Sequence, residues 1–192
     1  MQSVRLATKA KARGYRWLAL ELDDFNNTAW WPEFQFACRE QGILPGTWVT
    51  EGQNLGRWEP TDSAFMIAED EGPLDRTGIL AAIDAGFLPD KPKAIIGNGW
   101  WTSPVPDQLK KAVDAGFHYI TECYARTDAG QPTGYTPDGL AWNAHTYLGF
   151  PYDRIQPCFG MFGGAGDADY AQWKPANPGW SDYTVDYVLV NA

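Results

Sequence analysis

The stretch VDAGFHYITE, residues 113–122, contains the pattern that decides the fold. A helix-forming segment runs into Ala115-Gly116-Phe117, and an apolar run begins directly at His118. Glycine just past a helix end takes the left-handed conformation without a Cβ clash, and the aromatic residue after it covers the last turn. The stretch therefore predicts a helix that stops at Gly116 and a buried strand that follows at once.

The same helix stop followed by an apolar strand occurs five times along the chain. The stops lie at Gly14, Gly42, Gly86, Gly116 and Gly149, and the strands predicted after them cover residues 17–23, 46–50, 93–98, 118–124 and 154–160. Two more strands are predicted at 64–71 and 180–186. Strands that alternate with helices pair in parallel through right-handed crossovers. The sequence therefore predicts an α/β protein with about seven parallel strands.

The predicted parallel strands favour a (β/α) barrel, TIM-barrel-like, over a doubly wound open sheet. The open sheet usually carries a Gly-rich phosphate turn after its first strand, and Asp23-Asp24-Phe25 has none. A complete barrel takes about 250 residues, with about 200 near the lower limit. The chain has 192 residues and starts with a helical segment. We expect one domain, residues 1–192, forming an incomplete barrel whose first strand is missing.

Charge and hydropathy exclude several classes of partner. The net charge is −9, and no basic stripe offsets it, so a nucleic-acid backbone would be repelled. No apolar run is long enough to span a bilayer, and the first ten residues lack the apolar core of a signal peptide. We expect no nucleic-acid partner, no membrane insertion and no export signal of its own. A neutral carbohydrate fits this composition better.

Cofactor motifs are missing from the sequence. The three cysteines, Cys38, Cys123 and Cys158, are spaced too widely for a disulfide framework or a zinc site and are interpreted as buried thiols. Two histidines are too few for a multi-histidine metal centre. The chain has no phosphate-binding Gly loop and no Gly-x-Ser-x-Gly elbow. We expect neither a metal nor a cofactor.

Acidic residues gather at the ends of the predicted strands, where barrel enzymes place their active sites. Alternation puts the following carboxylates on the strand faces opposite those that pack under helices: Glu21, Asp23, Glu69, Glu71 and Glu122. Paired carboxylates are the usual machinery of glycoside hydrolysis. We predict Glu71 and Glu122 as the catalytic pair, supported by Asp23 and Glu69. Glu21 is predicted to line the substrate-binding site.

Two other interpretations of these carboxylates stay open. Each one serves equally well as a helix cap or as half of a buried ion pair. Asp23, Asp24, Glu69 and Glu71 also supply the oxygen ligands that a divalent cation takes, although no spaced loop motif accompanies them.

Aromatic residues flank the same strand ends and offer flat surfaces for sugar rings. The predicted substrate-binding residues are Trp48, Trp100, Trp101 and Tyr124, together with Asn98. Trp30 is interpreted differently, because Trp30, Phe34 and Cys38 recur at helical spacing and predict a helix face in the core.

Several longer strings carry a family resemblance. AKARGYRWLALELDD, CREQGILPGTWVTEG, FMIAEDEGP, AGFHYITECY and QPCFGMFGG resemble the TIM-barrel, glycoside-hydrolase-like domains in tail-associated proteins of phages infecting actinobacteria. The resemblance covers most of the chain. It implies an extracellular virion component that contacts other virion proteins and acts on carbohydrate of the host cell envelope. Such domains are catalytic or degenerate, so the alternative is an inactive barrel that serves as a structural or carbohydrate-binding component.

Overall fold

The structure is a computed structural model that describes residues 2–12, 14–21, 25–49, 62–70, 72–86, 90–97, 108–122, 137–159 and 185–186. The chain divides into two compact units, Met1–Ala94 and Ile95–Ala192, and each is described by itself. The elements of the first unit are α1 (Gln2–Ala12), β1 (Trp17–Glu21), α2 (Phe25–Glu40), β2 (Leu44–Val49), β3 (Met66–Glu69) and α3 (Pro73–Asp84). Those of the second are α4 (Gln108–Asp114), β5 (His118–Glu122), α5 (Pro137–Leu148), η2 (Tyr152–Arg154), β6 (Ile155–Phe159) and β7 (Val185–Asp186), and β4 (Lys93–Gly97) crosses the division.

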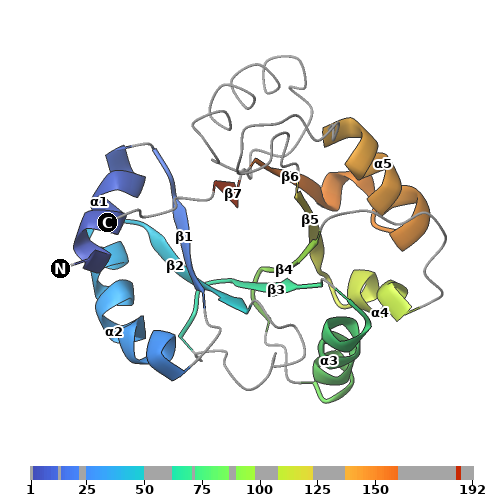
Figure 1. Cartoon of the computed structure of the whole chain (residues 1–192), viewed down its shortest axis with the longest axis horizontal. Helices are drawn as coiled ribbons and strands as arrows, with labels where there is room; N and C mark the ends of the chain where they lie inside the picture. The colour runs from blue at the N-terminus through green and yellow to red at the C-terminus, as the bar shows by residue number, and fades with distance from the viewer. Residues whose placement is uncertain are drawn as a thin grey trace. The chain divides into compact units, whose positions relative to one another are not determined.

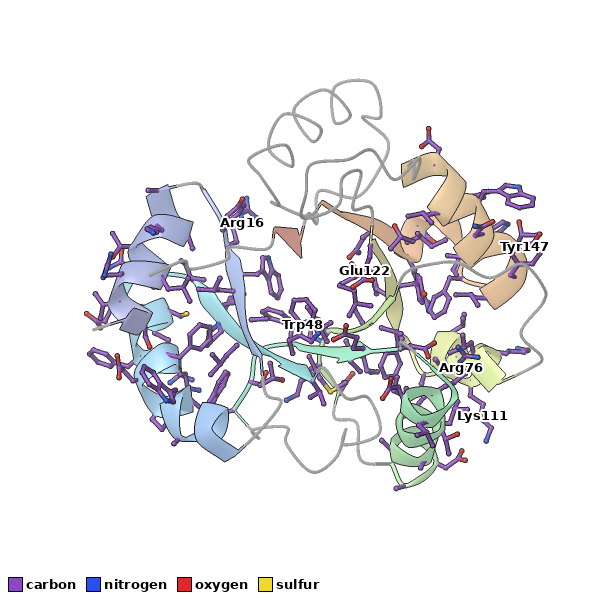
Figure 2. All side chains as sticks on the ribbon, in the orientation of Figure 1. Arg16, Trp48, Arg76, Lys111, Glu122 and Tyr147 are labelled. Carbon is purple, nitrogen blue, oxygen red and sulfur yellow. The ribbon has the colours of Figure 1, made fainter. Side chains whose placement is uncertain are left out.

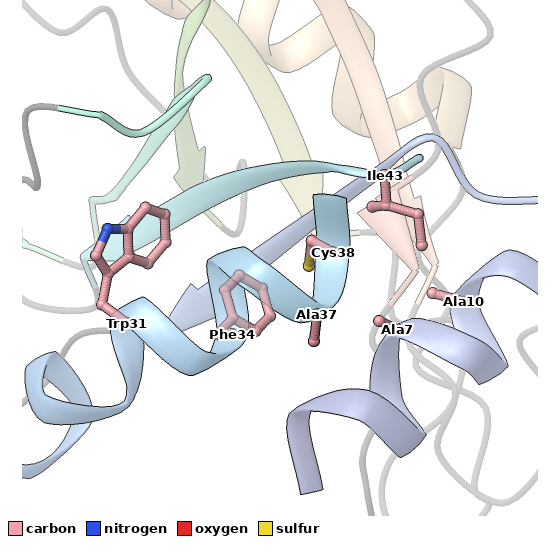
Figure 3. Packing of buried hydrophobic residues seen from close by; sticks show 7 residues of the cluster. All are labelled: Ala7, Ala10, Trp31, Phe34, Ala37, Cys38 and Ile43. Atoms are coloured by element: carbon pink, nitrogen blue, oxygen red, sulfur yellow. The ribbon is translucent and has the colours of Figure 1, made fainter. Parts of the chain in front are cut away.

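In the first unit, β1, β2 and β3 pair in parallel and in chain order. Helices α1 and α2 lie side by side next to β1 and β2, and α2 packs against both strands (Figure 1). Figure 3 shows the buried cluster that the two helices form with Ile43, just before β2: Ala7, Ala10, Trp31, Phe34, Ala37, Cys38 and Ile43. Leu18 and Leu20 of β1 pack against this cluster, which confirms the strand face that alternation assigned to the helices.

In the second unit, β5, β6 and β7 also pair in parallel and in chain order. Tyr119 of β5 contacts the ring of Phe150, just after α5, with the ring centroids 5.2 Å apart. Leu109 and Ala112 of α4 are buried as well. The core of this unit therefore lies between the strands and the helices α4 and α5.

The five helix stops are confirmed. Gly14, Gly42, Gly86, Gly116 and Gly149 all have a positive φ, between 62° and 83°. At three stops the N–H after the glycine reaches back to the carbonyl five residues earlier, for example from Phe117 to Ala112 at 3.0 Å. This bond satisfies a carbonyl that the helix end leaves without an intrahelical donor.

All seven predicted strands have a counterpart in the structure. The predicted α/β class and the parallel pairing are confirmed for β1–β2, β2–β3, β5–β6 and β6–β7. The strand expected at 180–186 is described only at Val185–Asp186. Among the described residues, no helix has both the length and the apolar character that a membrane crossing requires.

The prediction for Trp30 is wrong. Trp30 is 46% exposed, whereas its neighbour Trp31 is 7% exposed and packs against Phe34 in the core. The buried stripe of α2 therefore runs through Trp31, Phe34 and Cys38, at spacings of three and four residues. Helical spacing is compatible with either tryptophan on the buried face, and the structure buries Trp31.

Candidate functional site

The candidate site in the first unit lies on the face of β1–β3 opposite α1 and α2, here called the opposite face. The register pairs Ala19 with Gly46, and Trp48 with Ile67. Partners in parallel strands project to the same side of a sheet, and residues next to Leu18 and Leu20 project away from the helices. Ala19, Gly46, Trp48 and Ile67 therefore belong to the opposite face.

Aromatic rings fill the amino-terminal half of the opposite face. Phe65 lies over Gly46 so closely that a Cβ atom built on Gly46 would come within 2.2 Å of the ring. Trp17 contacts the same ring edge-on, at a centroid distance of 5.1 Å and an interplanar angle of 72°. The two rings form an apolar floor, and glycine at position 46 provides the space for it.

The carboxyl-terminal half of the opposite face is polar. The indole Nε1–H of Trp48 donates a hydrogen bond to Oε2 of Glu69, at 3.2 Å. Trp48 is 6% exposed, and Glu69 is half-buried. Figure 2 shows Trp48 on the side of β2 away from α2. The structure therefore places a tryptophan and a carboxylate together at the strand ends, where sequence analysis predicted functional residues.

Asp70, the residue after β3, forms a buried ion pair on the other side of the sheet. Nε and Nη2 of Arg76, in α3, donate to both carboxylate oxygens at 3.1 to 3.2 Å (Arg76 is labelled in Figure 2). Burial raises the pKa of Asp70 above its ordinary value, although the Arg76 charge acts to lower it. Asp70, which is not among the predicted site residues, therefore has a structural role as half of a buried ion pair.

In the second unit, Glu122 ends β5 and is 7% exposed. Alternation places Glu122 with Ile120 and His118, while Tyr119 between them packs toward Phe150. Figure 2 shows Glu122 on the side of β5 away from α5. In this unit too, a parallel strand therefore ends in a carboxylate, which lies on the side away from α5.

His118 lies at the opposite end of the same strand from Glu122. Nε2 of Gln156, on β6, donates to Nδ1 of His118 at 2.9 Å, an arrangement that suits a neutral imidazole. Burial lowers the pKa of His118 below its ordinary value, and the nearby charge of Arg154 lowers it further. The pair therefore joins β5 to β6 through an uncharged hydrogen bond.

The structure describes only part of the predicted site. Glu69, Glu122 and Trp48 are described with their side chains, and Glu21 is the last residue of β1, in register with Trp48. The remaining predicted site residues lie outside the described residues: Asp23, Glu71, Asn98, Trp100, Trp101 and Tyr124. Of the predicted residues, the structure brings Trp48 and Glu69 into direct contact.

The structure contains another indole–carboxylate contact, which the sequence also did not predict. Trp31 donates from Nε1 to Oδ1 of Asp62 at 2.9 Å, and Gln35 donates to Oδ2 of the same carboxylate. The hydrogen bond from Trp31 is the main cause that lowers the pKa of Asp62. Trp31 and Gln35 are four residues apart in α2, a spacing that puts both on one face. Their partner, Asp62, lies far along the chain, so no local sequence pattern predicts the contact.

Within the described ranges, no group of three or more His, Cys, Asp or Glu side chains is arranged to hold a metal ion. No family model, curated protein or solved structure matches the chain.

Proposed function

We propose that this protein acts on carbohydrate and hydrolyses a glycosidic bond. One observation supports the proposal most directly. In each unit, a parallel strand ends in a carboxylate on the side away from helices that pack on its sheet: Glu69 at the end of β3 and Glu122 at the end of β5. Carboxylates at strand ends are the groups that glycoside hydrolysis needs, and a neutral sugar suits a chain of net charge −9.

The proposed reaction uses two carboxyl groups. One, in its protonated form, donates a proton to the glycosidic oxygen as the bond to the anomeric carbon breaks. The other, ionised, either attacks the anomeric carbon or takes a proton from the water that does so. We assign this chemistry to Glu71 and Glu122, with Asp23 and Glu69 in support. Glu71 and Asp23 come from the sequence prediction alone.

The fold and the biological setting belong to the same proposal. The alternation of helices with parallel strands supports a TIM-barrel-like arrangement. The resemblance to tail-associated phage domains supports a virion component that meets the host envelope. Envelope glycan from actinobacteria is therefore the first substrate to test.

The test uses three variants of the full chain with purified actinobacterial envelope glycan. Glu71→Gln and Glu122→Gln each remove a proposed catalytic carboxylate while keeping its size. Glu40→Gln, at the exposed end of α2, is the matched control. Mass spectrometry of released oligosaccharides should show release by the wild type and by Glu40→Gln, and loss of release by the other two.

Two outcomes of this test count against the proposal, the first against the assigned residues and the second against hydrolysis itself. Undiminished release by both Glu71→Gln and Glu122→Gln excludes them as the catalytic pair. Binding of glycan by the wild type, with no oligosaccharide released, favours the alternative of an inactive carbohydrate-binding virion component.

A further inference from the structure

We propose that Trp48 is a positioning residue for Glu69, and that Glu69 so held accepts hydrogen bonds from sugar hydroxyl groups. The inference deepens the proposed function and rests on it. Trp48 then acts on the substrate through Glu69.

The first support is the contact itself. Trp48 and Glu69 come from adjacent strands, and the register places both on the opposite face. The indole Nε1–H donates to Oε2 of Glu69 at 3.2 Å. A hydrogen bond to an ionised carboxylate is stronger than one between neutral groups, and it favours one rotation of the carboxylate. Glu69 is therefore held in a defined orientation at the strand end.

The second support is the burial of the indole. A tryptophan that stacks on a sugar needs an exposed ring face, and Trp48 is only 6% exposed. Exposed tryptophans occur elsewhere among the described residues, for example Trp142 at 51%. The ring of Trp48 is thus packed as a support, while half-buried Glu69 retains surface for a ligand.

The third support is the ion pair that holds the next residue, Asp70. Asp70 directly follows Glu69 and projects to the other side of the sheet, where Arg76 of α3 binds both of its oxygens. The end of β3 is therefore fixed from both faces, by β2 through Trp48 and by α3 through Arg76. A site whose supporting residues are themselves locked needs less reorganisation when it binds its ligand.

The fourth support is the shape of the opposite face. Phe65 and Trp17 fill the half that lies toward the strand starts, with Phe65 against Gly46. The apolar floor leaves the polar group, Glu69, at the carboxyl end. A carboxylate accepts hydrogen bonds and donates none when ionised, so it matches the hydroxyl donors of a neutral sugar.

The experiment compares Trp48→Phe, Glu69→Gln and the control Trp142→Phe in the full chain. In ¹H–¹⁵N NMR spectra, the signal that Trp48→Phe removes identifies the Trp48 indole N–H. We expect this signal to move upfield in Glu69→Gln and to stay in place in Trp142→Phe. An indole signal that does not respond to Glu69→Gln overturns the inference.

Kinetics on the glycan give the second readout. We expect Trp48→Phe to lower kcat about tenfold, as expected for losing one hydrogen bond to a charged group, with KM nearly unchanged. Glu69→Gln should lower turnover at least as much, and the double variant should be no worse than Glu69→Gln alone. Full turnover by a folded Trp48→Phe protein overturns the inference.

The two proposals fail in different ways. An NMR response to Glu69→Gln in a protein that neither binds nor cleaves glycan overturns the proposed function, and it reduces the Trp48–Glu69 bond to a structural contact. Glycan release that is undiminished in Trp48→Phe leaves the proposed function intact and removes only the role assigned to Trp48.

Discussion

Arg76 donates hydrogen bonds to both carboxylate oxygens of Asp70, and so ties the end of β3 to the helix that follows it. Both side chains are buried. Neither charge has ready access to water, so each depends on the other for stabilisation. The relationship bears on the proposed function because Glu69, which the proposal places in the site, immediately precedes Asp70.

Removing one member of this pair should destabilise the fold strongly. We expect Arg76→Met to lower the free energy of unfolding by about 3–5 kcal/mol, because it leaves the Asp70 carboxyl buried without its counter-charge. The double variant Asp70→Leu/Arg76→Met should lose less. Urea unfolding monitored by circular dichroism measures both. The exposed pair Lys110–Asp114 provides the control, and Lys110→Met should cost less than about 1 kcal/mol. Equal losses at the two pairs would contradict this account of Asp70.

The pH dependence of stability should reflect the protonation of His118. Burial lowers the pKa of His118 in the folded state, so the unfolded chain binds a proton more readily near the ordinary value of 6.5. The free energy of unfolding should therefore fall as the pH drops from 7.5 through 6.5, and level off below the folded-state pKa. His118→Gln should show a shallower fall between pH 7.5 and 5.5 in urea unfolding. The same substitution at His145 is the control, and identical slopes for wild type and His118→Gln would refute the assignment.

Gly46→Ala should destabilise the first unit by overpacking. The added methyl group would lie 2.2 Å from the Phe65 ring, which must then shift together with Trp17. Overpacking of this kind costs about 1–3 kcal/mol. Phe65→Leu in the Gly46→Ala background should recover part of the loss. Thermal unfolding of the single and double variants tests this, and a Gly46→Ala protein as stable as the wild type would show that the floor is loosely packed.

The thiol of Cys38 should be unreactive in the folded protein. Burial raises its pKa to about 12, so almost none is thiolate at pH 8. Iodoacetamide at pH 8, followed by peptide mass mapping, should leave Cys38 unmodified until urea unfolds the chain. Labelling at the same rate with and without urea would disprove burial. Cys123 lies outside the described residues, as does the side chain of Cys158, so the interpretation of those two as buried thiols stays a prediction.

The sequence predicted the elements of the fold well because the relevant signals are local. A helix stop at Gly116 depends on the glycine and the few residues beside it, and the five observed positive φ angles follow from that local chemistry. Alternation in Trp17–Leu20 likewise separated the leucines that face the helices from the residues that do not.

The contacts that hold the candidate site were beyond the sequence because their partners are distant. Trp48 and Glu69 are 21 residues apart, and the hydrogen bond between them depends on the register of β2 against β3. The choice between Trp30 and Trp31 shows the same limit. Helical spacing accepts both, and the buried one donates to Asp62, 31 residues away.

The most direct test of the account is the yield of new reducing ends when the full chain is incubated with purified actinobacterial envelope glycan. The proposed function predicts that the wild type and Glu40→Gln generate reducing ends at matching rates and that Glu122→Gln generates none above background. Equal rates for Glu122→Gln and Glu40→Gln, or no reducing ends from the wild type, would contradict it.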